Sequence, residues 1–198
     1  MSDTRARPLL ETDVDRDPLA QFLRWLDDAR GAVRAPEAMA LATADGDGAP
    51  SVRMVLLKQA DERGFAFFSG YESRKGRDLA ANPRAALLFH WDPLGRQVRI
   101  AGPVERLGAE ESDAYFATRP PGARAAARGS RQSAPIAGRE ELENAALRAG
   151  AGDRPDWWGG YVLRPQSYEF WQHREDRLHD RLRYEPESAG WRIVRLAP

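Results

Sequence analysis

Residues 170–181, which read FWQHREDRLHDR, gather side chains that could bind an anion. Alternate side chains of a β-strand share a face, so we expect Arg177, His179 and Arg181 to point the same way. A row of basic groups repels itself unless an anion lies opposite, and the planar guanidinium of arginine suits phosphate. The competing interpretation is a solvated edge strand whose arginines pair with the acidic residues beside them.

Further cations lie at positions where a strand or a helix start does not need them. Arg53 and Lys58 bracket the apolar centre of a predicted strand, a pattern that also protects edge strands. Arg74 and Lys75 follow Ser73 at a predicted helix start, where the helix dipole disfavours positive charge unless an anion is bound. We therefore predict a phosphate site at this helix start.

Several polar residues interrupt apolar surroundings. Gln97 lies within a predicted strand, and Gln132 and Ser133 close a segment rich in alanine and arginine. Arg119 follows a Tyr-Phe pair that begins at Tyr115, in a loop that ends a predicted helix. Taken singly, each glutamine has an ordinary interpretation as a solvent-facing side chain.

The composition excludes several classes of function. The 198 residues include 30 Lys and Arg and 30 Asp and Glu, so no global field attracts nucleic acid or a membrane surface. The absence of cysteine excludes disulfides and thiol chemistry, and 3 histidines leave little scope for a metal site. We predict no metal. No apolar run approaches about 20 residues and no signal-peptide core is recognisable, which predicts a cytoplasmic protein without a membrane span.

The hydrophobic pattern predicts one domain over residues 17–198, preceded by a mobile polar tail over residues 1–16. Five or more antiparallel strands joined by tight turns predict a mainly β fold, a β-barrel with flanking helices. Helices are expected from residue 18 to a point before Pro36 and over residues 73–81, 109–118 and 140–148, while residues 123–133 receive no assignment. Strands are expected over residues 38–43, 51–58, 65–68, 84–91, 96–106, 159–172, 177–184 and 191–196.

Taken together and in this order, these residues resemble the pyridoxamine 5′-phosphate oxidase family. The similarity runs from about residue 17 to residue 198. Each motif alone is weak evidence, and their occurrence in the same order makes the resemblance strong. The matching motifs are RMVLLK at 53–58, FFS at 67–69, SRK at 73–75, RQV at 96–98, YF at 115–116, RP at 119–120, RQS at 131–133, EFW at 169–171, RLHDR at 177–181 and RLAP at 195–198.

The resemblance implies a split β-barrel homodimer that binds FMN at the subunit interface. Arg53, Lys75 and the turn at Arg74 would hold the FMN phosphate, and the partner subunit would contribute Trp171 and Arg181. The full implied cofactor set is Arg53, Met54, Val55, Leu56, Leu57, Lys58, Phe68, Ser69, Arg74, Lys75, Gln97, Gln132, Ser133, Trp171 and Arg181.

The resemblance also implies an oxidase that converts pyridoxamine or pyridoxine 5′-phosphate to pyridoxal 5′-phosphate and reduces O2 to H2O2. Arg177 and His179 would be its catalytic residues. The implied substrate-binding set is Lys58, Tyr115, Arg119, Arg177, Leu178 and His179.

Two alternatives stay open. Related split-barrel oxidases act in phenazine-type metabolism, although an unphosphorylated tricyclic substrate would have no use for Lys58. A non-catalytic module that binds flavin or pyridoxal phosphate would not need both Arg177 and His179. One departure concerns the substrate: Ala123 stands where the family often has a small hydroxyl residue, four positions after Arg119.

Overall fold

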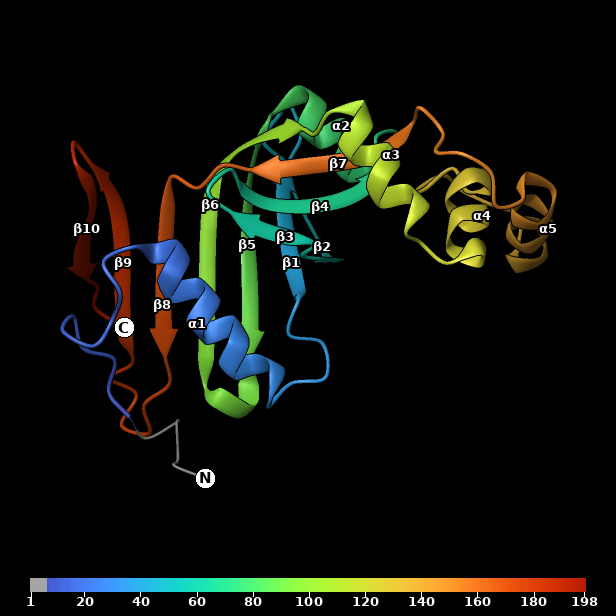
Figure 1. The fold of residues 1–198 in the computed structure, drawn as a ribbon. Coiled ribbons are helices and arrows are strands. Elements are labelled where there is room, and N and C mark those ends of the chain that lie inside the picture. Colours follow the sequence, from blue (N-terminus) through green and yellow to red (C-terminus); the bar gives the residue numbers. More distant parts are fainter. Residues whose placement is uncertain (1–6) are drawn as a thin grey trace.

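A side-chain cap precedes the first helix. The Asp17 side chain accepts a hydrogen bond from the Leu19 N–H at 3.0 Å, and α1 (Pro18–Arg30) follows. Its buried side, which includes Phe22 and Trp25, packs on the sheet. The computed structural model describes residues 7–198. Its helices flank a central antiparallel sheet (Figure 1).

The described residues form a 10-stranded sheet in which all paired strands are antiparallel. The strands follow the order β10-β9-β8-β6-β5-β1-β2, and β4 pairs with both β3 and β7. Their bounds are β1 (Ala38–Ala44), β2 (Pro50–Leu56), β3 (Gln59–Asp61), β4 (Gly64–Gly70), β5 (Arg84–Trp91), β6 (Arg96–Arg106), β7 (Trp158–Leu163), β8 (Ser167–Gln172), β9 (Asp180–Glu187) and β10 (Gly190–Arg195).

The long strand β6 divides the sheet into two parts. Residues 96–101 of β6 pair with β8, whereas residues 104–106 pair with β7. Gly102 lies between these two stretches, and a Cβ atom there would come within 1.9 Å of the Arg164 carbonyl oxygen. The division therefore depends on a residue without a side chain, and the result is the split barrel that the sequence predicted.

Large aromatic side chains fill the centre of the barrel. Phe22 of α1 contacts Phe65 and Phe89 at ring-centroid distances of 4.8 and 4.9 Å, and all three are fully buried. Phe170 and Tyr184 continue this core beneath β8 and β9. Burial of these rings, together with the aliphatic side chains around them, stabilises the fold.

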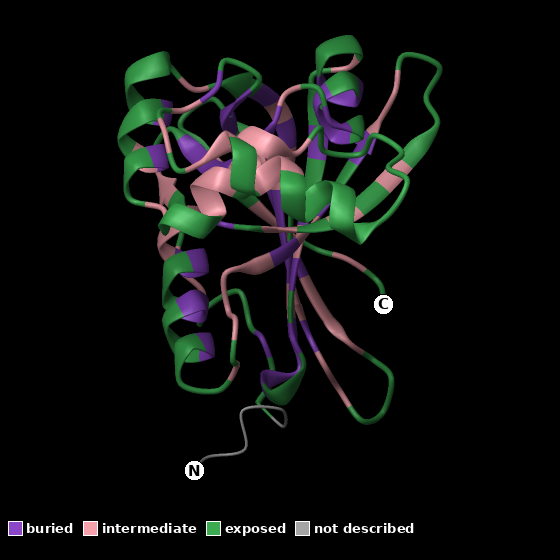
Figure 2. Ribbon diagram, turned by 90° about the vertical axis from the view of Figure 1, so that its right-hand side faces the viewer, coloured by how far each residue is buried: buried purple, intermediate pink, exposed green. Residues whose placement is uncertain are grey.

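The remaining helices are α2 (Arg74–Ala81), α3 (Ala109–Ala117), α4 (Pro121–Gly129) and α5 (Arg139–Ala149), with a short 3-10 turn η2 (Asp92–Leu94) between β5 and β6. α3 packs on β7, while α4 and α5 pack on each other and project from the barrel (Figure 1). Within the described chain no residue of these two helices is buried (Figure 2). α4 occupies most of the segment that received no assignment from sequence.

Two expected strands have different limits in the structure. The strand expected over 159–172 is two strands, β7 and β8, separated by a turn at residues 164–166. The strand expected over 177–184 starts only at Asp180, because Arg177 has a left-handed backbone (φ 68°) and closes a turn. The expectation that Arg177 and His179 alternate along a strand with Arg181 is therefore wrong.

Part of the expected N-terminal tail contacts the C-terminal hairpin. Leu9 is buried, and its N–H donates to the Asp180 carboxylate at 3.1 Å. Arg195 binds the Leu9 carbonyl and the Glu11 carboxylate, both at 2.8 Å. A mobile tail does not describe residues 7–16, and the rest of that prediction falls on residues 1–6, outside the described residues.

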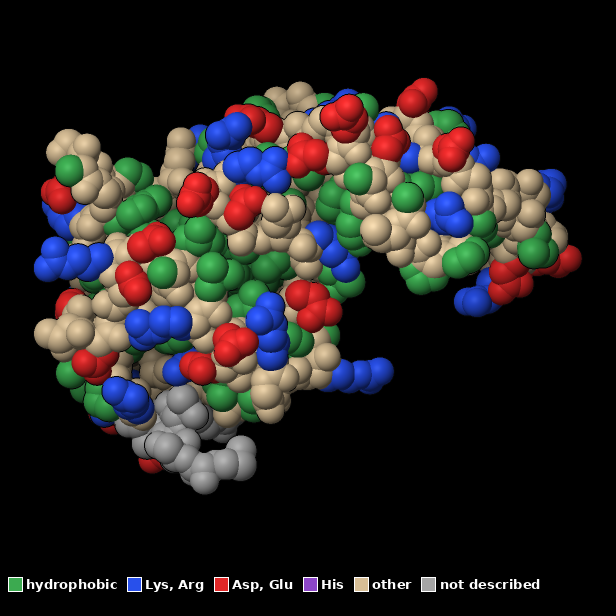
Figure 3. All heavy atoms as spheres, viewed as in Figure 1, with side chains coloured by type: hydrophobic (Ala, Val, Ile, Leu, Met, Phe, Trp, Pro, Cys, Tyr) green, Lys and Arg blue, Asp and Glu red, His purple; other side chains and the backbone are tan. Residues whose placement is uncertain are grey.

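Charges of both signs alternate over the surface seen in Figure 3. This agrees with the balance of 30 basic and 30 acidic residues, which predicts no extended basic face. A search of the described helices finds none with the length and apolar character needed to cross a bilayer.

Candidate active site

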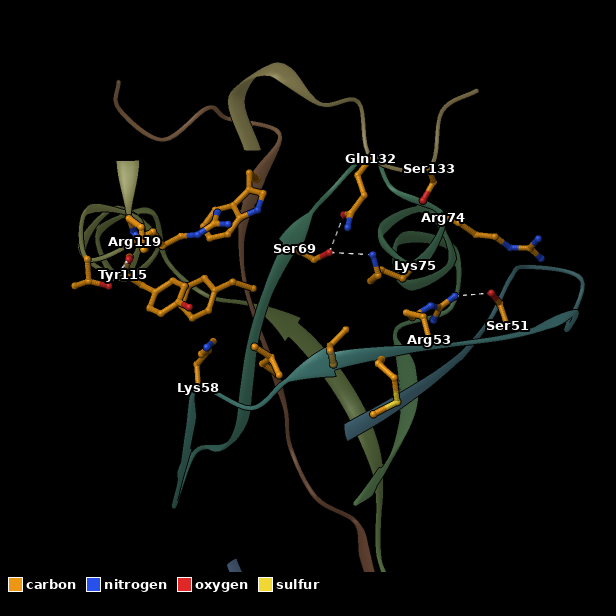
Figure 4. Close-up of a pocket in the computed structure, with 17 residues that line it drawn as sticks. Ser51, Arg53, Lys58, Ser69, Arg74, Lys75, Tyr115, Arg119, Gln132 and Ser133 are labelled. Carbon is orange, nitrogen blue, oxygen red and sulfur yellow. Dashed lines mark hydrogen bonds between the residues drawn. The ribbon is translucent and has the colours of Figure 1, made fainter. Parts of the chain in front are cut away.

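A cavity of about 770 Å³ opens between β2, β4, α2 and α3 (Figure 4). Five cations and no carboxylate occur among its described lining residues, so the cavity favours anions. The lining residues are Ser51, Arg53, Met54, Val55, Leu56, Lys58, Phe68, Ser69, Arg74, Lys75, Tyr115, Thr118, Arg119, Pro120, Gln132, Ser133 and Trp158.

One end of the cavity is built on the N-terminus of α2. The Ser73 Oγ accepts from the Gly76 N–H at 3.3 Å and so caps the helix. The Lys75 ammonium lies 3.1 Å from the Ser69 Oγ and 3.3 Å from the Ser73 Oγ. Lys75 is only 6% exposed, and burial together with repulsion from Arg53 lowers its pKa to about 8.

Arg53 faces this helix start from β2. Its guanidinium donates to the Thr43 Oγ1 at 2.7 Å and to Ser51. The Asp78 carboxylate lies 3.6 Å from Arg53 and also attracts Lys75, yet burial still lowers the pKa of Arg53. One carboxylate thus serves two cations, the buried Lys75 and the partly buried Arg53. A phosphate at the helix start would supply the missing negative charge.

The opposite end of the cavity holds a second cationic group, Lys58 and Arg119 (Figure 4). Tyr115 stacks on Phe68 at a ring-centroid distance of 3.9 Å, and the Lys58 Nζ lies 5.9 Å from the Tyr115 ring. The Arg119 guanidinium lies 4.6 Å from the Trp158 ring.

Arg119 has unused donor capacity. Its Nη1 is buried without a hydrogen-bond partner among the described residues, and burial lowers its pKa. A buried donor without a partner costs free energy, and an anion that enters this end of the cavity would remove that cost.

Gln132 connects the α4–α5 link to β4. Its Oε1 accepts from the Ser69 Oγ at 3.0 Å and from the Gly70 N–H at 3.2 Å. Ser133 follows with a left-handed backbone (φ 73°), which is uncommon for a residue with a side chain. Both residues line the cavity, as the resemblance implies.

The cavity thus gathers most of the cofactor set and part of the substrate set that the resemblance implies. Leu57 is an exception, because it is buried in the core. Four lining residues lie outside the implied cofactor and substrate sets. Ser51 was detectable, since it lies two positions before Arg53 on one strand; Thr118 and Pro120 flank Arg119, and Trp158 reaches the cavity only through tertiary packing.

The other implied residues form a second cluster away from this cavity lining. Gln97, Trp171 and Arg181 lie side by side across β6, β8 and β9, since Gln97 pairs with Trp171 and Trp171 with Arg181. The His179 ring lies 4.6 Å from that of Trp171. Arg181 is held by the Glu169 carboxylate at 2.9 Å and by the Ala197 carbonyl at 2.7 Å.

Arg177, Leu178 and His179 lie in the connection between β8 and β9. Arg177 and Leu178 are exposed, and the His179 Nδ1 accepts from the Arg174 N–H at 3.0 Å. Burial, followed by the positive charges of His173 and Arg177, lowers the pKa of His179, while Asp176 raises it. Within one chain, therefore, the implied catalytic residues do not line the cavity.

The sequence matches two family descriptions that together span most of the chain. Residues 26–150 match "Pyridoxamine 5′-phosphate oxidase", and residues 158–198 match "Pyridoxine 5′-phosphate oxidase C-terminal dimerisation region". The pyridoxine/pyridoxamine 5′-phosphate oxidase of Cupriavidus taiwanensis is 56% identical over 197 residues, which cover 96% of this chain and 93% of the relative. The enzyme of that name from Bordetella petrii is 57% identical with the same coverage.

Two solved structures share the fold. PhzG from Burkholderia lata, in complex with tetrahydrophenazine-1-carboxylic acid, superposes with a TM-score of 0.91 at 36% identity and covers 98% of this chain and 100% of its own. A pyridoxamine 5′-phosphate oxidase-related, FMN-binding protein from Nostoc punctiforme gives a TM-score of 0.72 at 19% identity, with 90% and 96% coverage.

The fold is thus that of the split-barrel class. The chain belongs to the pyridoxamine 5′-phosphate oxidase family, which is a family of FMN-dependent oxidoreductases. Its last 41 residues, 158–198, match the dimerisation region of that family, which supports a homodimer.

Proposed function

We propose that this protein oxidises pyridoxamine 5′-phosphate or pyridoxine 5′-phosphate to pyridoxal 5′-phosphate. O2 is the acceptor and leaves as H2O2; the amine substrate also consumes water and releases ammonia. The observation that carries the proposal is the presence of two separate cationic groups in one cavity. A reaction between a phosphorylated cofactor and a phosphorylated substrate needs two such groups.

FMN would place its phosphate at the start of α2, between Arg53, Arg74 and Lys75. The unbalanced charge of Arg53 and Lys75 supports this position, because the two cations share one carboxylate. Ser69, Gln132 and Ser133 would contact the remainder of the cofactor from the same subunit. When bound, FMN supplies the hydride-accepting chemistry, and the protein supplies its orientation.

A second copy of the chain would complete the site. Met54 and Leu56 line the cavity yet are 64% and 44% exposed, and the neighbouring Val52 is 69% exposed. All three are on β2, which is an edge strand of the described sheet. Exposed apolar side chains on an edge strand favour an interface with another chain.

The partner subunit is the proposed source of the second cluster. Gln97, Trp171 and Arg181 would meet the flavin from β6, β8 and β9 of the partner. Arg177 and His179 would then cover the substrate ring, with the Arg177 guanidinium close to the reacting carbon and His179 as a hydrogen-bond donor. In this proposed arrangement the active site lies at the dimer interface, and O2 reaches it after the substrate is oxidised.

Lys58, Tyr115 and Arg119 would hold the substrate phosphate. The buried, unpaired Nη1 of Arg119 supports this role. Ala123 supplies no hydroxyl group to this phosphate, so the three residues would carry the contact without it.

The test is reconstitution of the purified protein with FMN, followed by addition of pyridoxamine 5′-phosphate in air. We expect pyridoxal 5′-phosphate and H2O2 to appear in equal amounts. A flavin-loaded protein that produces neither compound, from the amine or the alcohol substrate, would refute the substrate assignment.

PhzG supports a second candidate, the oxidation of a tricyclic phenazine precursor, because this structural relative is 36% identical over nearly the whole chain. Lys58 and Arg119 favour the phosphorylated substrate, since a phosphate dianion matches two cations better than the single carboxylate of a phenazine carboxylic acid. Parallel assays with a reduced phenazine carboxylic acid and with pyridoxamine 5′-phosphate distinguish the two functions.

A further inference from the structure

Three aromatic rings meet where β8 ends, and the proposed function uses only two of them. The ring centroids of Trp171 and His179 lie 4.6 Å apart, those of His173 and His179 lie 5.3 Å apart, and those of Trp171 and His173 lie 6.1 Å apart. The sequence alone gives His173 no partner and no role. Its position in this cluster indicates that it has a role.

The backbone of His173 is tied to the connection between β5 and β6, because its N–H donates to the Gly95 carbonyl at 2.7 Å. The turn that carries Arg177 is closed by a 3.2 Å bond from the Arg177 N–H to the Arg174 carbonyl. His173 thus meets the His179 ring from an anchored strand end, while His179 lies beyond this turn.

The hydrogen bond from the Arg174 N–H determines where His179 carries its proton. Because Nδ1 accepts this bond at 3.0 Å, the proton of the neutral imidazole is on Nε2. A second proton at Nδ1 would turn the acceptor into a donor facing a donor, and the bond would be lost. The neutral form of His179 thus keeps the connection in its observed conformation.

The charged groups around His179 act on its protonation in opposite directions. Burial disfavours the charged imidazole and lowers its pKa, the charges of His173 and Arg177 lower it further, and Asp176 opposes them. The adjacent Asp180 is occupied by Arg195 at 2.7 Å and by the Leu9 N–H at 3.1 Å. His173 is the one histidine among these neighbours of His179.

We infer that His173 is a positioning residue for His179: its ring packs against the His179 ring and, as a second basic group beside it, opposes a second proton on His179. The Arg174 N–H selects the Nε2 tautomer, and His173 maintains the orientation in which that bond forms. The inference rests on the proposed function in one respect only, namely that His179 contacts the substrate. The coupling between the two rings is a property of the chain alone.

The first test titrates the histidine rings directly. The chain has 3 histidines, so NMR of the FMN-loaded protein labelled in its imidazole rings resolves each of them. His173→Phe keeps an aromatic ring and removes the charge, and we expect the titration midpoint of His179 to rise. His90→Phe, at an exposed position of β5, is the matched control and should leave the midpoint unchanged. An unchanged His179 midpoint in His173→Phe overturns the inference.

The second test reads the same coupling in turnover. Relative to wild type, kcat/KM of His173→Phe should be about three-fold lower at pH 6 than at pH 8, the size expected for two charges at this separation near a surface. His173→Ala also removes the ring and should raise KM at both pH values while kcat changes less. Equal pH profiles for wild type and His173→Phe would also overturn the inference.

The two tests separate the inference from the proposed function. If the His179 midpoint rises but no B6 vitamer is oxidised, the coupling stands and the proposed function fails. If the vitamer is oxidised and the midpoint does not move, the proposed function stands and His173 has no positioning role.

Discussion

The cavity between β2 and α2 and the connection between β8 and β9 are built in opposite ways. In the cavity the cations come from β2, α2 and the loops that follow β2 and α3, and three of the five are at least partly buried, with Lys75 only 6% exposed. In the connection Arg177 is exposed and occupies a left-handed backbone conformation. The first region is preformed, whereas the second depends on a few local hydrogen bonds.

This difference matches what each region is proposed to do. A phosphate site gains affinity when its donors are fixed and desolvated before the ligand arrives. A segment that covers a substrate has to admit and release it, so it comes from the less stable part of a structure. Strain at Arg177 is then a feature of the covering segment, by which we mean the connection between β8 and β9. An uncommon backbone angle persists only where its surroundings maintain it.

The largest expected effect on activity comes from Arg177, in the connection between β8 and β9. Arg177→Ala should lower kcat by about 10²–10³-fold, the usual range for loss of one charged group at a reacting centre. FMN binding should persist, because the cavity cations are intact. Stopped-flow reduction and flavin fluorescence measure the two properties separately.

Arg177→Gly is the matched control, since glycine accepts the left-handed backbone at no cost. Equal loss in both variants assigns the effect to the guanidinium. Recovery of activity in Arg177→Gly would instead assign the effect of Arg177→Ala to the backbone and would contradict the proposed role.

A smaller effect is expected at the substrate end of the cavity. Arg119→Ala should raise KM for pyridoxamine 5′-phosphate by about 10- to 100-fold, because a hydrogen bond to a charged group is worth about 1.5–3 kcal/mol. FMN content should not change. Unphosphorylated pyridoxamine provides the comparison: a parallel loss with both substrates would show that Arg119 does not act on the phosphate.

The flavin end should show a pH dependence of its own, above neutral pH. The pKa of Lys75 is lowered to about 8, so the free protein loses this positive charge as the pH rises through 8. FMN affinity should therefore decrease by up to about 10-fold between pH 7 and 9, following one lost charge. Lys75→Met should bind FMN weakly with little pH dependence, and a pH profile unchanged from wild type would exclude Lys75 from phosphate binding.

The stability of the FMN-free protein should change in the opposite direction. Lys75 binds its proton less tightly in the folded chain than in the unfolded chain, where its pKa is near 10.5. Between pH 8 and 10.5 the unfolded state binds more protons, so this group makes the free energy of unfolding rise with pH. Comparing thermal melts of wild type and Lys75→Met over this range isolates the contribution.

The sequence predicted the preformed region better than the exposed one, and the reason is physical. Asp17 and Ser73 cap helices through contacts a few residues away, so their signals are local. Likewise, Arg53 follows from a strand pattern, whereas Lys58, expected at the end of the same strand, lies two residues past the end of β2. By contrast, the alternation assumed for Arg177 and His179 failed because a turn replaces the strand there.

Residues that reach the cavity through tertiary packing were not predictable from local patterns. Trp158 begins β7 and meets Arg119 from a different part of the chain. The N-terminal contact of Leu9 with Asp180 joins residues 171 positions apart, and a polar stretch gives no sign of it. Such contacts depend on the completed sheet rather than on neighbouring residues.

The smallest effect is expected where the two termini support the exposed region. Glu11 pairs with Arg195, which in turn binds Asp180 at the start of β9. Because exposed ion pairs contribute about 1 kcal/mol or less, Glu11→Gln should raise KM only about two- to three-fold and leave FMN affinity unchanged. The effect should decrease at high salt, since screening weakens exposed pairs. Arg139→Gln, which removes an exposed pair on α5, is the matched control, and an equal change in both variants would show that Glu11 has no particular link to the covering segment.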